Sequence, residues 1–250
     1  MKKTYYFANW KMYQSFAGID AFLMEYATDN VLAADADVYV GIAASYEHIY
    51  YLSQKLENSS LYLGAQDCSQ FLHGAYTGQV SLQSLMQMQL SFCIVGHSEV
   101  RQLLGQSYET IALKFKVLLA ANISPILCIG ETLVQKEDGV TLQILYDQLE
   151  SVLEFLQSYQ GTTKIFIAYE PVYAIGTGVI PETHELQEIF YFLQKLVKEL
   201  PVAKNIMFLY GGSVHTQTIG LLKNLEGISG FLIGKASIDF QALKKIVECE

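Results

Sequence analysis

The carboxylate best placed in the sequence to act as a general base is Glu170. It follows the apolar run Ile165–Ala168 after one tyrosine and stands directly before Pro171. Because proline has no N–H for a sheet ladder, we expect strand pairing to stop beside Glu170, which leaves its carboxylate at the carboxyl end of a buried strand. The segment Gly176–Gly178 suits either a tight surface turn or a loop that closes over a ligand. Taken alone, this stretch leaves a structural role for Glu170 equally open.

A lysine and an asparagine follow the first apolar run of the chain. Asn9 and Lys11 flank Trp10, so both can point to one side of the chain while the indole packs on the other. A solvated surface position is the plainer interpretation of one lysine taken alone. Its neighbours weigh against that interpretation, and Lys11 remains a candidate for the same site as Glu170.

A histidine follows a further apolar run. His97 stands between Gly96, which would break a strand, and Ser98, which can cap a short helix. A lone histidine is more often a hydrogen-bonded structural residue. A helix that begins here would lower the imidazole pKa and favour the neutral form, which can donate a hydrogen bond to a carbonyl. The spacing therefore permits an electrophilic role for His97.

Two glycine-containing turns could bind an anion. The segments Tyr210–Val214 and Leu232–Ala236 each place glycine or small residues between an apolar run and the start of a helix. Backbone N–H groups in such turns can bind a phosphate, and the last two strands of an α/β barrel commonly lead into a phosphate site. A tight turn would explain one of them, whereas two in consecutive units favour phosphate binding.

The elements that must position these residues are strands that alternate with amphipathic helices. We count eight such rounds, which predict strands over Thr4–Ala8, Asp37–Ala43, Leu61–Gly64, Phe92–Val95, Ile123–Ile129, Lys164–Ala168, Ile206–Tyr210 and Gly230–Ile233. Apolar residues at three- and four-residue intervals predict helices over Ser107–Ala121, Val140–Tyr159, Glu182–Leu200 and Ile238–Glu248. This order predicts an α/β protein with a single (β/α)8 TIM barrel over residues 1–250, with an open doubly wound sheet as the rival. In a barrel, the polar residues above would share the carboxyl face.

The composition argues against several other classes of protein. The formal net charge of −9 disfavours nucleic acid or an anionic membrane as a partner. There is no G-x-G-x-x-G or Walker motif, and the five histidines show no metal-ligand spacing, so we expect neither cofactor nor metal. The four cysteines form no C-x-x-C motif and the apolar stretches are too short to span a membrane, which indicates a cytoplasmic protein.

Taken together, the motifs resemble those of the triosephosphate isomerase family from Tyr5 to Phe240. The matching segments are Asn9–Met12, Gly74–Gly78, Val95–Glu99, Cys128–Glu131, Ala168–Gly178, Tyr210–Ser213 and Gly230–Gly234. The resemblance implies interconversion of glyceraldehyde 3-phosphate and dihydroxyacetone phosphate through an enediolate, without a cofactor, in glycolysis and gluconeogenesis. In that family this reaction uses a glutamate base, a neutral histidine and a closing loop.

The resemblance also implies roles for individual residues. Glu170 would be the base, His97 the neutral electrophile, Lys11 the stabiliser of negative charge, Asn9 a group that orients oxygens, and Glu99 a carboxylate that contacts the lysine. Backbone N–H groups of four residues would bind the phosphate, namely Gly176, Ser213, Gly234 and Lys235. The lid over it would comprise Pro171, Val172, Tyr173, Ala174, Ile175, Thr177 and Gly178 together with Gly176.

A homodimer is implied as well. The loop Gln66–Gln79, with Tyr76 and Thr77, would enter the neighbouring subunit, and Thr77 would approach the active site there. A polar loop would otherwise be expected to lie on the surface. The alternative to an enzyme is a non-catalytic phosphate-ligand sensor or surface protein that retains the same barrel.

The sequence departs from the family pattern at several positions. Tyr173 stands where the family usually has tryptophan, so we expect altered hinge packing with turnover retained. Lys235 replaces a second glycine, which preserves the N–H if its backbone angles suit a residue with a Cβ. The resemblance implies one charge network at three further positions, where this chain has Gln79, Val100 and Gln106. All three charges are absent together, so we expect a neutral replacement compatible with a folded dimer.

Overall fold

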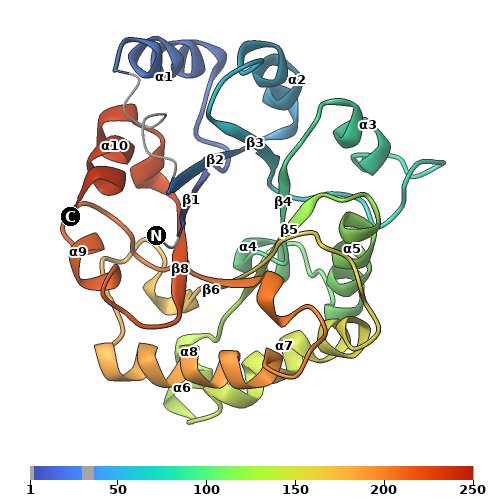
Figure 1. Ribbon diagram of the computed structural model, residues 1–250, viewed down its shortest axis with the longest axis vertical. Coiled ribbons are helices and arrows are strands. Elements are labelled where there is room, and N and C mark those ends of the chain that lie inside the picture. Colours follow the sequence, from blue (N-terminus) through green and yellow to red (C-terminus); the bar gives the residue numbers. More distant parts are fainter. Residues whose placement is uncertain (1–2, 30–36, 250) are drawn as a thin grey trace.

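The computed structural model describes residues 3–29 and 37–249. Within these residues, eight parallel strands form a closed barrel in the order β1 to β8, surrounded by a ring of helices (Figure 1). β8 pairs with β1, which closes the sheet and leaves no edge strand. This closure confirms the predicted (β/α)8 TIM barrel and excludes the open doubly wound sheet.

The strands agree with the prediction to within two residues at either end. They are β1 (Thr4–Asn9), β2 (Val38–Ala44), β3 (Tyr62–Ala65), β4 (Phe92–Val95), β5 (Ser124–Ile129), β6 (Ile165–Tyr169), β7 (Ile206–Tyr210) and β8 (Ile228–Ile233). Strand pairing stops at Tyr169, directly before Glu170 and Pro171, as expected from the missing proline N–H.

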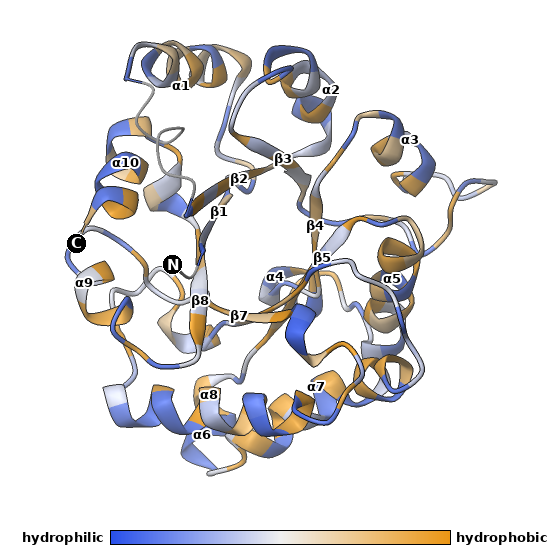
Figure 2. Ribbon diagram, in the orientation of Figure 1, coloured by the Kyte–Doolittle hydropathy of each residue, from blue (hydrophilic) through white to orange (hydrophobic). Residues whose placement is uncertain are grey.

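The predicted helices are present but shorter than expected. The helices are α1 (Phe16–Asp29), α2 (Tyr46–Lys55), α3 (Leu82–Gln87), α4 (Ser98–Gln102), α5 (Tyr108–Ala120), α6 (Leu133–Glu137), α7 (Thr141–Leu156), α8 (Thr183–Val197), α9 (Ile219–Leu222) and α10 (Phe240–Glu248). Short 3-10 turns are η2 (Val172–Ala174), η3 (Ala203–Asn205) and η4 (Lys235–Ser237). Ser107 and Glu182, which were predicted to begin two of these helices, are instead their N-cap residues. Their side chains accept hydrogen bonds from backbone N–H groups of the first helical turn. Figure 2 shows hydrophobic and hydrophilic residues in alternating bands along the helices around the barrel.

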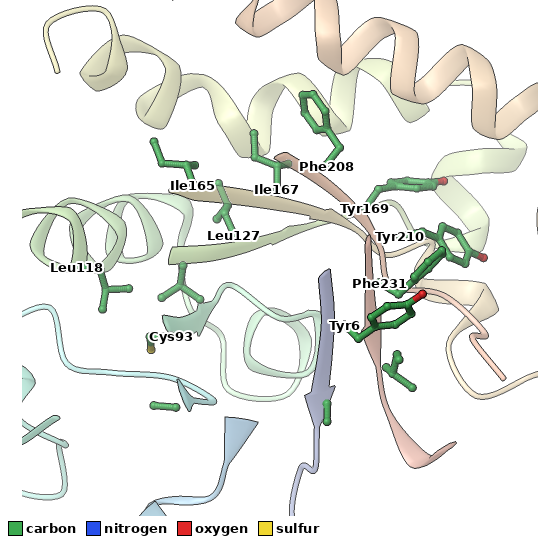
Figure 3. Packing of buried hydrophobic residues seen from close by; sticks show 14 of the residues in the cluster. Tyr6, Cys93, Leu118, Leu127, Ile165, Ile167, Tyr169, Phe208, Tyr210 and Phe231 are labelled. Atoms are coloured by element: carbon green, nitrogen blue, oxygen red, sulfur yellow. The ribbon is translucent and has the colours of Figure 1, made fainter. Parts of the chain in front are cut away.

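The core has two layers, one inside the barrel and one between barrel and helices. Inside, the ring of Phe92 occupies the space left by two glycines. A Cβ built on Gly41 or Gly64 would lie 2.5 or 2.4 Å from that ring, so no larger residue fits at either position. In the outer layer, Ile165, Ile167 and Phe208 point from the strands toward the helices (Figure 3).

The alternation of side chains along each strand decides what reaches the carboxyl face. In β6, Ile165, Ile167 and Tyr169 belong to the outer layer, whereas Phe166 and Ala168 belong to the inner one. Continuing this period of two places Glu170 on the inside, at the mouth of the barrel. The same alternation in β1 places Asn9 inside and Trp10 outside.

Candidate active site

A cavity of about 570 Å³ opens at the carboxyl ends of the strands. It is lined by side chains from β1, β4 and β6, by three residues of the predicted lid and by both glycine-containing turns: Asn9, Lys11, Tyr13, His97, Glu170, Ile175, Gly176, Gly178, Gly211, Gly212, Ser213, Val214, His215, Leu232, Gly234, Lys235 and Ala236. The polar residues predicted from separate strand ends therefore meet in one place. Tyr13 and His215 were not predicted, because nothing in their local sequence distinguishes them.

Lys11 is held in the cavity by its own backbone. Its φ of 49° is unusual for a residue with a Cβ, and two hydrogen bonds fix it. The N–H of Lys11 donates to Oδ1 of Asn9 at 3.2 Å, and the amide of Gln66 donates to the carbonyl of Lys11 at 2.8 Å. Trp10 is fully buried and its indole N–H donates to the carbonyl of Ser237 at 2.9 Å. The expected division of Asn9 and Lys11 from Trp10 is confirmed, whereas the role of Gln66 was missed.

Glu99 contacts the ammonium of Lys11 without lining the cavity itself. Oε1 of Glu99 lies 2.6 Å from Nζ of Lys11, and the carboxylate is about half exposed. The second oxygen of Glu99 lies 3.5 Å from Nδ1 of His97. Glu99 can therefore orient the ammonium of Lys11 from the rim of the site.

His97 points into the cavity because the chain turns at Gly96. Gly96 has a φ of +68°, which glycine adopts without strain and which redirects the residue that follows β4. The structure corrects the predicted cap: His97, rather than Ser98, is the N-cap of α4, and its Nδ1 accepts the N–H of Glu99 at 3.2 Å. Because Nδ1 is an acceptor in this bond, the neutral ring carries its proton on Nε2, which faces the cavity.

The proton affinities of His97 and Glu170 depend on each other. Nε2 of His97 lies 3.3 Å from Oε1 of Glu170, and both side chains are almost completely buried. Burial lowers the pKa of His97, but the Glu170 carboxylate outweighs this, so the pKa is raised above its ordinary value. The predicted lowering by the helix was therefore wrong for the ligand-free site. Burial raises the pKa of Glu170, but His97 opposes it and the net pKa is lowered.

Glycines make room for the Glu170 carboxylate. A Cβ on Gly211 would lie 2.7 Å from Cγ of Glu170, and a Cβ on Gly130 would lie 1.8 Å from its carbonyl oxygen. Oε2 of Glu170 is buried and has no hydrogen-bond partner among the described residues. A carboxylate with an unused buried oxygen is suited to accept a proton from a bound molecule.

The two turns after β7 and β8 border the cavity together. Gly234 lies close to Lys11, since a Cβ built on Gly234 would be 3.8 Å from Cε of that lysine. Lys235 begins η4 and does not have a positive φ. Its backbone therefore suits a residue with a Cβ, which was the condition for replacing the glycine at this position. Its side chain is exposed, which agrees with an ammonium that points to solvent.

The predicted lid is attached to the Ser213 turn. The hydroxyl of Ser213 donates to the carbonyl of Ala174 at 2.5 Å and accepts the N–H of Gly178 at 3.1 Å. Pro171 and η2 form the first part of the lid, and the hydroxyl of Thr177 donates to the carbonyl of Tyr173 at 3.2 Å. The lid thus lies over the cavity with its tip fixed to the turn after β7.

The predicted dimer-loop residues lie away from the cavity. Tyr76 is 42% exposed and stacks on Phe71 with the ring centroids 3.8 Å apart. Thr77 is exposed beside it. Within this chain, neither residue contributes to the wall of the cavity.

Residues 3–29 and 37–249 lack two other kinds of feature. No helix in these ranges is long and apolar enough to cross a membrane. No group of three or more histidine, cysteine, aspartate or glutamate side chains in the same ranges could hold a metal ion. Cys68, Cys93 and Cys128 are buried free thiols.

The sequence matches the protein-family model described as triosephosphate isomerase over residues 4–250. Curated proteins with that name match along nearly their whole length. The protein from Chlamydia felis is 35% identical over 251 residues, which cover 98% of this chain and 97% of its own. That from Methylococcus capsulatus is 35% identical over 250 residues, with 98% of both chains covered. That from Chlorobaculum tepidum is 38% identical over 244 residues, which cover 96% of this chain and 98% of its own.

Proposed function

The chain belongs to the triosephosphate isomerase family and is an isomerase, and from this premise we propose the roles of its residues in interconverting glyceraldehyde 3-phosphate and dihydroxyacetone phosphate. One observation carries the proposal. Glu170, His97, Lys11 and Asn9 line a single cavity together with the two glycine-containing turns. Nothing in the fold or the site favours the alternative of a non-catalytic sensor or surface protein.

Glu170 is the base in this proposal. Its carboxylate removes a proton from the carbon next to the substrate carbonyl and returns it to the neighbouring carbon. The lowered pKa keeps the carboxylate ionised at neutral pH. His97 lies 3.3 Å from Glu170, and in this proposal the carboxylate exchanges that contact for the substrate carbon. Burial without the His97 contact raises the pKa of Glu170 and thus strengthens it as a base.

The oxygens of the enediolate are stabilised by three side chains. His97 donates its Nε2 proton to the carbonyl oxygen, which its bond from the Glu99 N–H makes possible. Lys11 supplies positive charge and is held in place by Glu99 at 2.6 Å. Asn9, which is buried, orients the same oxygens.

The substrate phosphate is bound by backbone N–H groups of Gly176, Ser213, Gly234 and Lys235. Support comes from the turn after β8, where Gly234 and Lys235 line the cavity and η4 begins at Lys235. Lys11 lies beside Gly234 and adds positive charge. With its tip fixed to Ser213, the lid excludes water and protects the enediolate from losing phosphate.

The proposal includes a cytoplasmic homodimer. Support comes from apolar side chains exposed in the single chain, among them Met12 at 90%, Leu103 at 77% and Leu72 at 49%. Where such side chains gather in one patch, they are typical of a protein interface. The loop Gln66–Gln79 carries several of them and would place Thr77 near the neighbouring active site.

A coupled assay with glyceraldehyde 3-phosphate tests the function. Wild type should isomerise the substrate, and Glu170→Ala should lose about 10³-fold or more in kcat because no other carboxylate reaches the carbon. Binding of inorganic phosphate should be retained, which shows that the variant is folded. Equal and negligible turnover by both proteins with phosphate binding intact would instead support the sensor.

A further inference from the structure

The two ends of the lid are joined through one lysine that the mechanism above does not use. Nζ of Lys136 donates to the hydroxyl of Tyr173 at 2.9 Å and to Oε2 of Glu185 at 2.8 Å. Tyr173 lies in η2 at the beginning of the lid, whereas Glu185 lies in the first turn of α8, the helix that follows the lid. Lys136 itself belongs to α6, in the neighbouring unit of the barrel.

Both helices that carry this contact begin with a capping box. Oε2 of Glu185 also accepts the N–H of Glu182 at 3.1 Å, as part of the capping box of α8. α6 begins with a second capping box, formed by Thr132 and Gln135. Capping therefore orders the first turn of α8 and fixes the carboxylate of Glu185, whereas Lys136 follows the capped start of α6 in its last turn.

The hydroxyl of Tyr173 lies in a partly open space. A cavity of about 270 Å³ borders the ring and is lined by Glu131, Tyr169, Lys136 and Glu185, among others. The ammonium of Lys136 lies 4.9 Å from the centre of the ring. The hydroxyl of Tyr169 donates to Glu131 at 3.0 Å, so it is already hydrogen-bonded elsewhere. Lys136 is therefore the group that hydrogen-bonds the hydroxyl of Tyr173.

The state of the lid seen here combines two attachments. The tip is bonded to Ser213, and the first turn is bonded to Lys136 at the same time. A group that contacts the lid in this arrangement and loses the contact on opening stabilises the closed lid. Residues that line the active-site cavity come from the same lid segment.

We propose that Lys136 is a positioning residue, which holds the lid closed over the bound phosphate by joining Tyr173 to Glu185. The effect of Lys136 on turnover rests on the proposed function. Its effect on ligand binding does not. Opening the lid requires the Tyr173 hydroxyl to leave the ammonium. Closure returns the hydroxyl to a charged donor, which makes a stronger bond than a neutral one.

Charged groups on every element around Lys136 support the same assignment. Glu185 faces it from α8 and Glu131 from the end of β5, while Tyr173 faces it from the lid. Burial lowers the pKa of Lys136. The bonds to Glu185 and Tyr173 raise it by more than burial lowers it, so the pKa lies above its ordinary value. The ammonium therefore stays charged throughout the range in which the enzyme works.

The test measures binding of glycerol 3-phosphate, a substrate-shaped ligand that cannot isomerise, by titration calorimetry. Lys136→Met and Tyr173→Phe should each raise its Kd about three- to tenfold, because the closed state becomes a smaller fraction of the population. The double variant should be no weaker than either single variant, since both remove the same contact. Lys136→Arg should restore binding to near the wild-type value.

Lys244→Met is the matched control. Lys244 makes a similar ion pair with Asp29 at 2.7 Å but lies on α10, away from the lid, and its loss should leave Kd unchanged. The proposal would be overturned if the increase in Kd in the double variant equalled the product of the increases in the two single variants. Unchanged binding in Tyr173→Phe would overturn it as well. Melting temperatures close to that of wild type show that each variant is folded.

The two proposals fail separately in this design. If wild type has no isomerase activity while the binding effects appear as expected, the proposed function fails and the role of Lys136 stands. If turnover is normal and the binding effects are absent, the role of Lys136 fails alone. With both intact, KM should rise in parallel with Kd in Lys136→Met.

Discussion

At the scale of single residues, the reaction depends on which atoms of His97 and Glu170 hold protons. The backbone N–H of Glu99 occupies Nδ1 of His97, which leaves Nε2 as the donor of the neutral ring. The Glu170 carboxylate raises the pKa of His97 and thereby works against that neutral state. A neutral electrophile at this position therefore requires that the contact with Glu170 be given up during the reaction.

This pair predicts a specific dependence on pH. As pH falls through the raised pKa of His97, above its ordinary value of about 6.5, the imidazolium pairs with Glu170 and kcat/KM should fall. Glu170 itself should stay ionised until below about pH 4.3, because its pKa is lowered. The measurement is the pH profile of kcat/KM for wild type and His97→Gln.

His97→Gln also provides the control for this profile. The residual activity of the variant should lose the limb that belongs to His97 and keep the limb of the substrate phosphate, whose second pKa is about 6, while burial without the His97 contact moves the limb of Glu170 upward. The ion pair between His97 and Glu170 should stabilise the fold most between about pH 4.3 and about pH 6.5. Below this range the stabilisation is lost as Glu170 takes up a proton, and above it the stabilisation is lost as His97 releases one. An identical profile in both proteins would contradict the assignment of the limb to His97.

At the scale of elements, an ion pair lies beside the predicted neutral replacement near α4 and α5. Gln106 donates to Oδ2 of Asp67 at 2.8 Å, and Lys114 of α5 pairs with the same carboxylate at 2.7 Å. Gln79 lies on the exposed loop that the proposed dimer would cover, so its part in a neutral replacement stays a prediction. The region therefore keeps one buried ion pair, between Lys114 and Asp67. Comparing Gln79, Val100 and Gln106 with the family pattern could not reveal this pair, because neither Lys114 nor Asp67 is one of those positions.

The ion pair leads to a prediction about stability. Lys114 is 4% exposed, so Lys114→Met should lower the free energy of unfolding by about 3–5 kcal/mol by leaving the Asp67 carboxylate with Gln106 alone. Urea unfolding at fixed protein concentration measures the loss. Lys198→Met is the comparison, because Lys198 and Glu199 are 77% and 90% exposed and 3.9 Å apart, and its effect should be about 0–1 kcal/mol. Similar losses in both variants would count against a buried, structural pair.

At the scale of the whole molecule, the carboxyl face carries both the active site and the apolar side chains assigned to a dimer. Sedimentation should report a dimer for wild type. Tyr76→Asp should shift it toward monomer, because the stacked rings of Tyr76 and Phe71 would enter the interface and a carboxylate there would be desolvated. Tyr191→Asp, at an exposed position on α8, should remain dimeric. A monomeric wild type would remove the basis for placing Thr77 near a second active site.

The sequence by itself determined the barrel and most members of the site. A period of two along each strand and three- to four-residue intervals along each helix are local properties, so they survive without knowledge of the fold. They placed β1 to β8 within two residues and put Glu170 and Asn9 on the inner face. Glycine beside His97 indicated the turn, because few other residues adopt its backbone angles.

Only the tertiary structure decided the contacts between distant units. The 3.3 Å approach of His97 to Glu170 reversed the expected pKa shift, and the hydroxyl of Tyr173 met Lys136 across the neighbouring unit. Such contacts depend on how closure of the barrel brings strand ends together, and on which rotamers the packing allows. Electrostatic interactions change steeply over these few ångströms, so their outcome is set by the folded geometry rather than by the order of residues.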